Sequence, residues 1–489
     1  VDVRNVTATG NGSLGINATN ASGDIDISGG NIESNGTGVN AEVKGVSISI
    51  PAIPVVLPSG FTLNIPGTGN VSVDVGNVNS SSGNGINATT GLGTVDVTAG
   101  NVTALNGFGV NATTNSGVEL PSDWSDVDFA ALLGDGVTVE VGDVTSGGNA
   151  INAEVKGVGV LPGIGNVSVN AGTVTSTAGN GINATTGIGT VGVVAGDVTA
   201  NGLGVNATTG LGIGLPDLSG GDPGDLVSLL TSGVTVDVGN VQSGGNAINA
   251  QVTGLDLPVI GELPGVGSVS VDAGNVTSLD GNGINATTGL GLVTVNAGDV
   301  SAENGFGVNA TAGIGLASVV VDDVTSKGQG INAEVTGGTF GDLADLIGIG
   351  DIPGIGLIDS GIGLAYVNAG DVTSTEGGGI NARTGIGAAI VLAEDVNSVM
   401  TGINAEAGTG LAFALADDVS TSGLNANGMN VEAGGVAVAI STGNVVTTDD
   451  GSYGVNVVAT PMGDLGPLGD FIDGLAGSGG LGGLIEDQL

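Results

Sequence analysis

The chain has 489 residues, 99 of them Gly, and its formal net charge is −43. A hydrophobic content of 40% excludes a disordered polar chain. The chain is not collagen either, because it has only 13 Pro and its Gly residues do not follow a Gly-X-Y period. The negative charge repels nucleic acids and anionic membrane surfaces, so we expect no nucleic-acid binding.

Residue types that carry most catalysis are scarce. The chain has no Cys and no His, and its five cations lie singly along the sequence at Arg4, Lys44, Lys156, Lys327 and Arg383. β-Helix lyases and hydrolases of polysaccharides use clusters of acids and cations in a groove. We therefore expect that the protein is not an enzyme. No run of 18 apolar residues occurs, so we expect no membrane insertion by this chain.

A short element, Gly/Ala-[Ile/Val]-Asn-Ala, recurs along the sequence, with closest spacings of 23 and 24 residues. A second element keeps step with it: a Val-x-Val strand, a two-residue turn ending in Asn or Asp, and Val-Thr-Ser/Ala. The segment 83–102, GNGINATTGLGTVDVTAGNV, shows both elements. Three short strands with β-branched residues at alternate positions and Gly at the corners predict one coil of a parallel β-helix.

One such coil cannot bury its apolar residues, whereas stacked coils can. We predict an all-β fold in which residues 1–460 form a single parallel β-solenoid of about fifteen coils of about 23 residues, on the order of 70 Å long. Residues 461–489 form an apolar, Gly-rich C-terminal tail.

The repeated Asn also lies in many of the sixteen Asn-x-Ser/Thr triplets, which are potential glycosylation sites. The Asn persists where the triplet is lost, as in Asn152-Ala153-Glu154 and Asn381-Ala382-Arg383. This pattern favours a structural ladder in which each amide bonds its neighbours in the stack, although glycosylation of exposed sites stays an alternative. The predicted ladder is Asn87, Asn111, Asn152, Asn183, Asn206, Asn249, Asn285, Asn309, Asn332, Asn381 and Asn404.

Apolar inserts interrupt the coils, in chain order near 46–68, 116–136, 212–233 and 337–361. Two interpretations are open: the inserts and the tail fold back as short helices over the solenoid, or they pack against a neighbouring molecule. The predicted interface residues are Trp124, Phe129, Leu229, Leu230, Phe340, Leu346, Ile347, Phe471 and Ile472.

The turn position that ends in Asn or Asp forms a second column. These residues bond locally to turn backbone, which accounts for their presence. Successive carboxylates about 5 Å apart would repel one another, and bound Ca²⁺ would relieve that repulsion. The candidate calcium ligands are Asp299, Asp323, Asp371, Asp395 and Asp418. We expect no other cofactor.

Two further patterns carry weaker hypotheses. The Gly-x-Gly triplets precede strands and no Gly-Lys-Ser/Thr follows, which disfavours a phosphate site. Paired threonines such as Thr89-Thr90 would form a flat hydroxyl array of the ice-binding kind, which the Glu-Val of the third coil type interrupts.

The pattern GxGINATTGxGxVxVxAGxVT resembles the repeat region of bacterial surface passengers, namely autotransporter adhesins and filamentous-haemagglutinin-like proteins. The resemblance covers residues 1 to about 460. It implies an extracellular, right-handed β-helix that forms a stalk, an adhesin or a coat.

From these features we predict an extracellular, cell-surface structural protein, a subunit of a filament, sheath or fibre assembled through apolar inserts and coil ends. Its partners would be further copies of itself and cell-surface glycans. The alternatives are an adhesin stalk and, third, a polysaccharide-acting enzyme.

Overall fold

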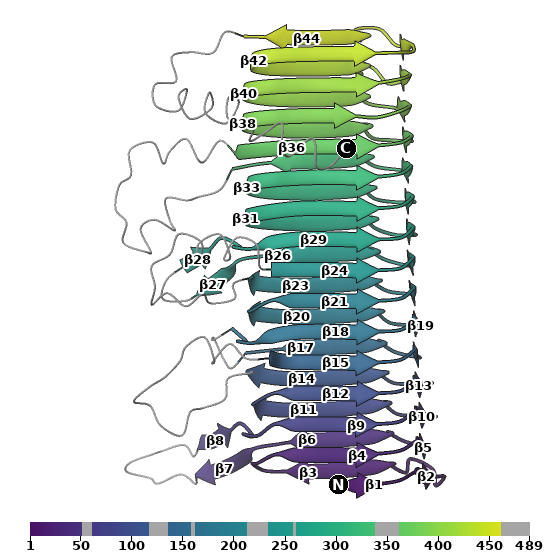
Figure 1. The fold of residues 1–489 in the computed structure, drawn as a ribbon, viewed down its shortest axis with the longest axis vertical. Helices are drawn as coiled ribbons and strands as arrows, with labels where there is room; N and C mark the ends of the chain where they lie inside the picture. The colour runs from purple at the N-terminus through teal and green to yellow at the C-terminus, as the bar shows by residue number, and fades with distance from the viewer. Residues whose placement is uncertain are drawn as a thin grey trace.

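The computed structural model describes residues 1–50, 61–116, 135–157, 162–212, 233–257, 261–337 and 361–460. These residues form one sheet of 25 strands, one of 15 and two of two strands, with no helix among them. The strands stack as successive coils along the long axis of the molecule (Figure 1). The predicted all-β parallel solenoid is therefore confirmed. No described residue belongs to a helix that would span a bilayer.

The Val-Thr-Ser/Ala element forms the 15-stranded sheet, which is parallel throughout. Each strand has three residues. The first and third face inward and are buried in thirteen of the fifteen strands, and the middle one faces outward and is exposed or partly exposed. The strands are β2 (Val6–Ala8), β5 (Ile32–Ser34), β10 (Val78–Ser80), β13 (Val102–Ala104), β16 (Val144–Ser146), β19 (Val174–Ser176), β22 (Val198–Ala200), β25 (Val241–Ser243), β30 (Val276–Ser278), β32 (Val300–Ala302), β34 (Val324–Ser326), β37 (Val372–Ser374), β39 (Val396–Ser398), β41 (Val419–Thr421) and β43 (Val445–Thr447).

The Ile/Val-Asn-Ala element forms one strip of the large sheet, in which the Asn of each coil pairs in register with the Asn of the next. Its separate strands are β3 (Ile16–Asn20), β6 (Val39–Val43), β11 (Ile86–Leu92), β14 (Val110–Ser116), β17 (Ile151–Val155), β20 (Ile182–Ile188), β23 (Val205–Leu211), β26 (Ile248–Val252), β35 (Ile331–Val335) and β44 (Val455–Ala459).

The Val-x-Val element forms the other strip of the same sheet. Its separate strands are β1 (Asp2–Val3), β4 (Ile25–Gly29), β9 (Val71–Val75), β12 (Val95–Ala99), β15 (Asp135–Val141), β18 (Asn166–Ala171), β21 (Val191–Ala195), β24 (Gly233–Val238), β29 (Ser268–Ala273) and β36 (Ile362–Ala369).

In five coils near the C-terminal end, the two strips join into single long strands, so the expectation of three separate strands in every coil was wrong there. The corner glycines lie inside these strands, because a positive φ lets the backbone bend while pairing continues. The long strands are β31 (Ile284–Ala297), β33 (Val308–Val321), β38 (Ile380–Leu392), β40 (Ile403–Ala416) and β42 (Met429–Ser441).

The core consists of columns of small apolar side chains. Val95 and Val97 of β12 are 0% exposed, whereas the alternate residues Asp96 and Thr98 face solvent. Period-two alternation therefore gives each strand one buried face. The corner needs Gly: Gly93 has φ 131°, and a Cβ there would lie 2.5 Å from the Gly69 carbonyl oxygen of the preceding coil.

Two antiparallel hairpins extend from the coils. β7 (Val46–Ile50) pairs with β8 (Phe61–Ile65), and β27 (Leu255–Leu257) pairs with β28 (Gly261–Leu263). Both are labelled on the left of Figure 1. The described part of the insert near 46–68 is thus a pair of strands, not the short helix that we considered. The inserts near 116–136, 212–233 and 337–361 lie almost wholly outside the described residues.

Candidate functional site

The repeated asparagines form an unbroken hydrogen-bonded ladder along the solenoid. In each coil the Asn side-chain Nδ2 donates to the Oδ1 of the equivalent Asn one coil earlier, at 2.6–2.9 Å. The eleven asparagines predicted from the sequence all lie in this ladder. Four more extend it, namely Asn17, Asn40, Asn430 and Asn456.

This geometry explains why Asn is kept when its neighbours change. Only a carboxamide carries both a donor and an acceptor on a short side chain, so only Asn bonds the coils before and after it. Seven glycosylation triplets have their Asn in the ladder. In six of them, including those at Asn87 and Asn285, the Nδ2 that would accept a glycan already donates to another amide.

The turn residues form a second column with a different bond. The Oδ1 of each Asn or Asp accepts the backbone N–H of the turn residue in the next coil, as from Asn101 to Asn77 at 2.8 Å and from Asp143 to Asn101 at 3.0 Å. Among the described coils, this column is interrupted at the exposed Thr173, whose backbone N–H donates to Asp143 but whose side chain has no Oδ1 to accept from Asp197. The column resumes in the next coil, where the backbone N–H of Asn240 donates to the Oδ1 of Asp197. A carboxylate and a carboxamide serve equally well here, because only an acceptor is needed.

The five candidate calcium ligands belong to this turn column. The Oδ1 of Asp299 accepts the N–H of Asp323 at 3.3 Å, and Asp371, Asp395 and Asp418 continue the pattern at 2.9–3.2 Å. In the part of the chain that the structure describes, no three potential ligand side chains group closely enough to hold a metal ion. The structure thus gives each of these aspartates a backbone partner and assembles no calcium site from them.

The paired threonines do not form one flat array. Thr89 lies on the outer side of β11, whereas Thr90 is 7% exposed and its hydroxyl donates to the carbonyl of the corner Gly69 at 2.7 Å. Thr114 makes the same bond to Gly93 at 2.9 Å. The inner threonines therefore satisfy corner carbonyls, and the ice-binding hypothesis was wrong for these pairs.

The predicted interface residues cannot be placed. Trp124, Phe129, Leu229, Leu230, Phe340, Leu346, Ile347, Phe471 and Ile472 all lie outside the described residues.

Four cations pair with nearby acids. Arg383 of β38 lies in register between Glu334 of β35 and Glu406 of β40, with Nε 3.0 Å from one Glu406 carboxylate oxygen and NH1 3.9 Å from Glu334. Its side chain is 49% exposed. Lys44, Lys156 and Lys327 each pair with one Glu. These are solvent-facing pairs on a strongly acidic surface.

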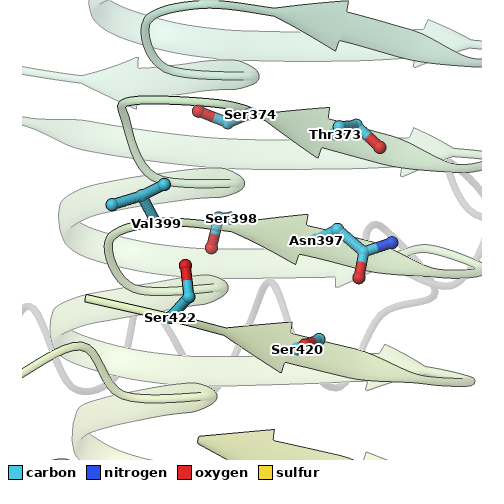
Figure 2. A pocket seen from close by; sticks show the side chains of 7 residues that line it. All are labelled: Thr373, Ser374, Asn397, Ser398, Val399, Ser420 and Ser422. Carbon is cyan, nitrogen blue, oxygen red and sulfur yellow. The ribbon is translucent and has the colours of Figure 1, made fainter. Parts of the chain in front are cut away.

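A shallow hollow of about 250 Å³ lies on the 15-stranded sheet across β37, β39 and β41. Figure 2 shows its lining side chains on successive coils: Thr373, Ser374, Asn397, Ser398, Val399, Ser420 and Ser422. Ser374 and Ser398 donate to the backbone carbonyls of Gly328 and Met400. The lining therefore offers neither a charged group nor an aromatic ring, and part of its hydroxyl set is already bonded.

An outward-facing apolar surface near the C-terminal end of the solenoid escaped the sequence interpretation. Tyr366 and Ile390, neighbours in register on β36 and β38, are 7% and 8% exposed although they occupy outward positions. The signal was present in segments such as GAAIVLA and GLAFALA. These lack the polar alternation of VDVTA, and continuous apolar runs indicate strands covered on both faces.

No protein-family model, curated protein or solved structure matches the chain.

Proposed function

We propose that the chain is an extracellular structural protein, a rigid solenoid subunit of a surface filament, sheath or fibre, which works by assembly rather than by catalysis. The observation that carries this proposal is the unbroken Asn ladder. With backbone pairing and the turn column, which Thr173 interrupts once among the described coils, it joins successive coils by up to three independent sets of bonds. Such redundancy suits a rod that must resist bending.

The last described coil supports association along the axis. Val455 and Val457 of β44 are in register with the buried Met429 and Val431, yet they are 47% and 46% exposed. The Oδ1 of Asn456 receives no amide from another described residue. Such a coil presents an apolar row and an open strand edge to a further coil.

The cell-surface location rests on the resemblance to autotransporter and filamentous-haemagglutinin-like repeats. Solenoid repeats of this kind have exposed faces of Thr, Ser, Asn and Asp, and the cell-surface glycans proposed as partners would meet these polar faces.

Negative-stain electron microscopy of the purified chain tests the proposal. We expect rods about 70 Å long that join end to end into fibres. Val457→Asp should shorten the fibres to single rods, because a carboxylate then faces the apolar end of the coil. Val194→Asp is the matched control, since Val194 is 47% exposed on the side of the solenoid. Rods that stay isolated at every concentration would favour the adhesin stalk instead.

A further inference from the structure

Three asparagines of the turn column leave one side-chain atom unused. In Asn5, Asn101 and Asn275, the Oδ1 accepts the backbone N–H of the next turn residue at 2.8, 3.0 and 3.1 Å. This bond holds each carboxamide with its oxygen toward the next coil. The Nδ2 of each has no hydrogen-bond partner among the described residues, and all three asparagines are exposed. A nucleophilic amide nitrogen is therefore open to solvent at three turns.

Each of these asparagines begins an Asn-Val-Thr triplet, the acceptor pattern of N-glycosylation at surface turns. Val102 and Val276, the middle residues of two triplets, are 0% exposed, so the Asn and the Thr on either side face outward together. Thr7 is exposed, and Thr103 and Thr277 are partly exposed. Their hydroxyls have no hydrogen-bond partner in the described ranges. Both groups that define the acceptor triplet are thus accessible.

The ladder and the turn column differ in what a sugar on the amide nitrogen would disturb. A ladder Asn uses both ends of its carboxamide, so a sugar on Nδ2 would crowd the neighbouring amide that accepts from it. A turn Asn uses only its oxygen, and a sugar on Nδ2 leaves that bond in place. The fold therefore tolerates glycosylation in the turn column and opposes it in the ladder.

The seven remaining triplets each lack one feature of the turn sites. Asn17 and Asn79 are exposed but lie inside strands β3 and β10. The Nδ2 of Asn20 donates to a backbone carbonyl, and so does the hydroxyl of Ser13 in the triplet of Asn11. The other three asparagines are only partly exposed: Asn35, Asn70 and Asn166.

We propose that Asn5, Asn101 and Asn275 are N-glycosylation sites, each of which takes one glycan from an activated donor of the glycosyl phosphate class. The Nδ2 forms a bond to the anomeric carbon of the sugar while the bond from that carbon to the phosphate oxygen breaks. The phosphate leaves with the electron pair, and a base of the transferring enzyme takes the Nδ2 proton. This inference deepens the proposed function and rests on it, because N-glycosylation acceptors belong to exported proteins.

The three sites share one edge of the solenoid, where the Val-x-Val strip turns into the 15-stranded sheet on the right of Figure 1. Asn101 lies three coils beyond Asn5, and Asn275 lies five coils beyond Asn101. At about 4.8 Å per coil, these separations are about 14 Å and about 24 Å. Glycans along this edge would coat one side of a fibre and leave the coil ends free for axial contacts.

Mass spectrometry of the full chain, secreted by a eukaryotic host that N-glycosylates its exported proteins, tests the assignment. An amidase that releases N-glycans in heavy-oxygen water converts each glycosylated Asn into a labelled Asp. We expect this label at Asn5, Asn101 and Asn275, above the level in a sample without amidase, and none at the ladder asparagines. Turn asparagines without label, in a chain secreted beside a fully glycosylated reporter protein, would overturn the inference. Equal labelling of the ladder would overturn it as well.

Two triple variants separate the acceptor triplet from the turn structure. The first removes the acceptor hydroxyls, keeps the asparagines with their turn bonds, and should lose all three glycans. The second changes the same outward strand position in triplets that begin with Asp, and should lose none. The first variant is Thr7→Ala, Thr103→Ala and Thr277→Ala, and its matched control is Thr145→Ala, Thr199→Ala and Thr325→Ala.

Two single substitutions create new triplets, one in each column. Asp143→Asn gives a further Asn-Val-Thr in the turn column, keeps the acceptor for the N–H of Thr173, and should gain a glycan. Glu154→Thr completes a triplet at Asn152, whose Nδ2 donates to Asn111 at 2.9 Å, and should gain none. Equal gains in the two variants would show that the use of Nδ2 in the ladder does not select the sites.

Electron microscopy of the same secreted protein separates this inference from the proposed function. Chains that carry glycans at the three turn sites but form no fibres would support the glycosylation sites and overturn the filament. Fibres built from chains without label at these sites would support the filament and overturn the glycosylation sites.

Discussion

The side-chain amide of Asn285 donates a 2.8 Å hydrogen bond to the Oδ1 of Asn249, which lies 36 residues earlier in the chain. Asn309 in turn donates to Asn285 at 2.8 Å. Each ladder amide is thus donor to one coil and acceptor to the other. This directionality makes the ladder sensitive to any change that removes only the donor.

Asn285→Asp should destabilise the solenoid. The new carboxylate still accepts from Asn309 but faces the acceptor oxygen of Asn249, so one hydrogen bond becomes a repulsive contact in a partly buried place. We expect a loss of about 1–3 kcal/mol, measured as a lower midpoint in urea. Asn201→Asp, in an exposed turn, adds the same charge outside the ladder and should change the midpoint little. Equal midpoints for the two variants would mean that the ladder contributes no stability.

Thr173→Asn should stabilise the protein. Thr173 interrupts the turn column, and an Asn at this position supplies the Oδ1 that the N–H of Asp197 lacks. A gain of about 1 kcal/mol is expected for one added hydrogen bond, read as a higher melting temperature. Thr173→Ala adds no acceptor and serves as the control, and if it stabilised the chain as much as Asn, the turn-column explanation would fail.

The repeat predicted the solenoid and its ladder because each coil places the same residue in the same environment. The Asn is kept while the residue two positions later changes from Thr89 to Glu154, which indicates that its amide, not a glycan, is needed. The turn column could be predicted for the same reason. Asn and Asp replace each other there because the hydrogen bond between coils uses only the side-chain Oδ1 as an acceptor.

Other features depended on contacts between unlike segments. Whether the corner at Gly291 separates two strands or bends one is decided by the backbone of the neighbouring coils. The β7–β8 hairpin arises from an insert that occurs once. The outward-facing apolar surface required knowing that Tyr366, Ile390 and Phe413 share an outward register position, because an apolar run does not by itself tell which of its residues face outward.

Arg383→Met should destabilise the protein only at low ionic strength. Arg383 lies between Glu334 and Glu406, and its loss leaves these two carboxylates, on the strands either side of β38, without the cation that pairs with both. Since the pair is about half exposed, the effect should stay within about 1 kcal/mol and vanish near 1 M NaCl, where the screening length is about 3 Å. Thermal melting at both salt concentrations measures this. Lys327→Met, whose partner Glu376 is 68% exposed, should show a smaller salt dependence, and a salt-independent loss at Arg383 would point to packing instead.

Tyr366 should give the protein an alkaline limit of stability. Burial among the outward-facing apolar side chains of β36 and β38 raises the pKa of its phenol above the ordinary value of 10.0. Since the unfolded chain releases this proton at lower pH than the folded chain, the stabilisation is fully present below pH 10.0 and is lost as pH rises through the folded pKa. Tyr366→Phe removes the ionisable group and should flatten stability against pH in this range. The phenolate absorbance change lost in the variant should occur above pH 10.0, and loss of a change centred at pH 10.0 would show that Tyr366 is open to solvent.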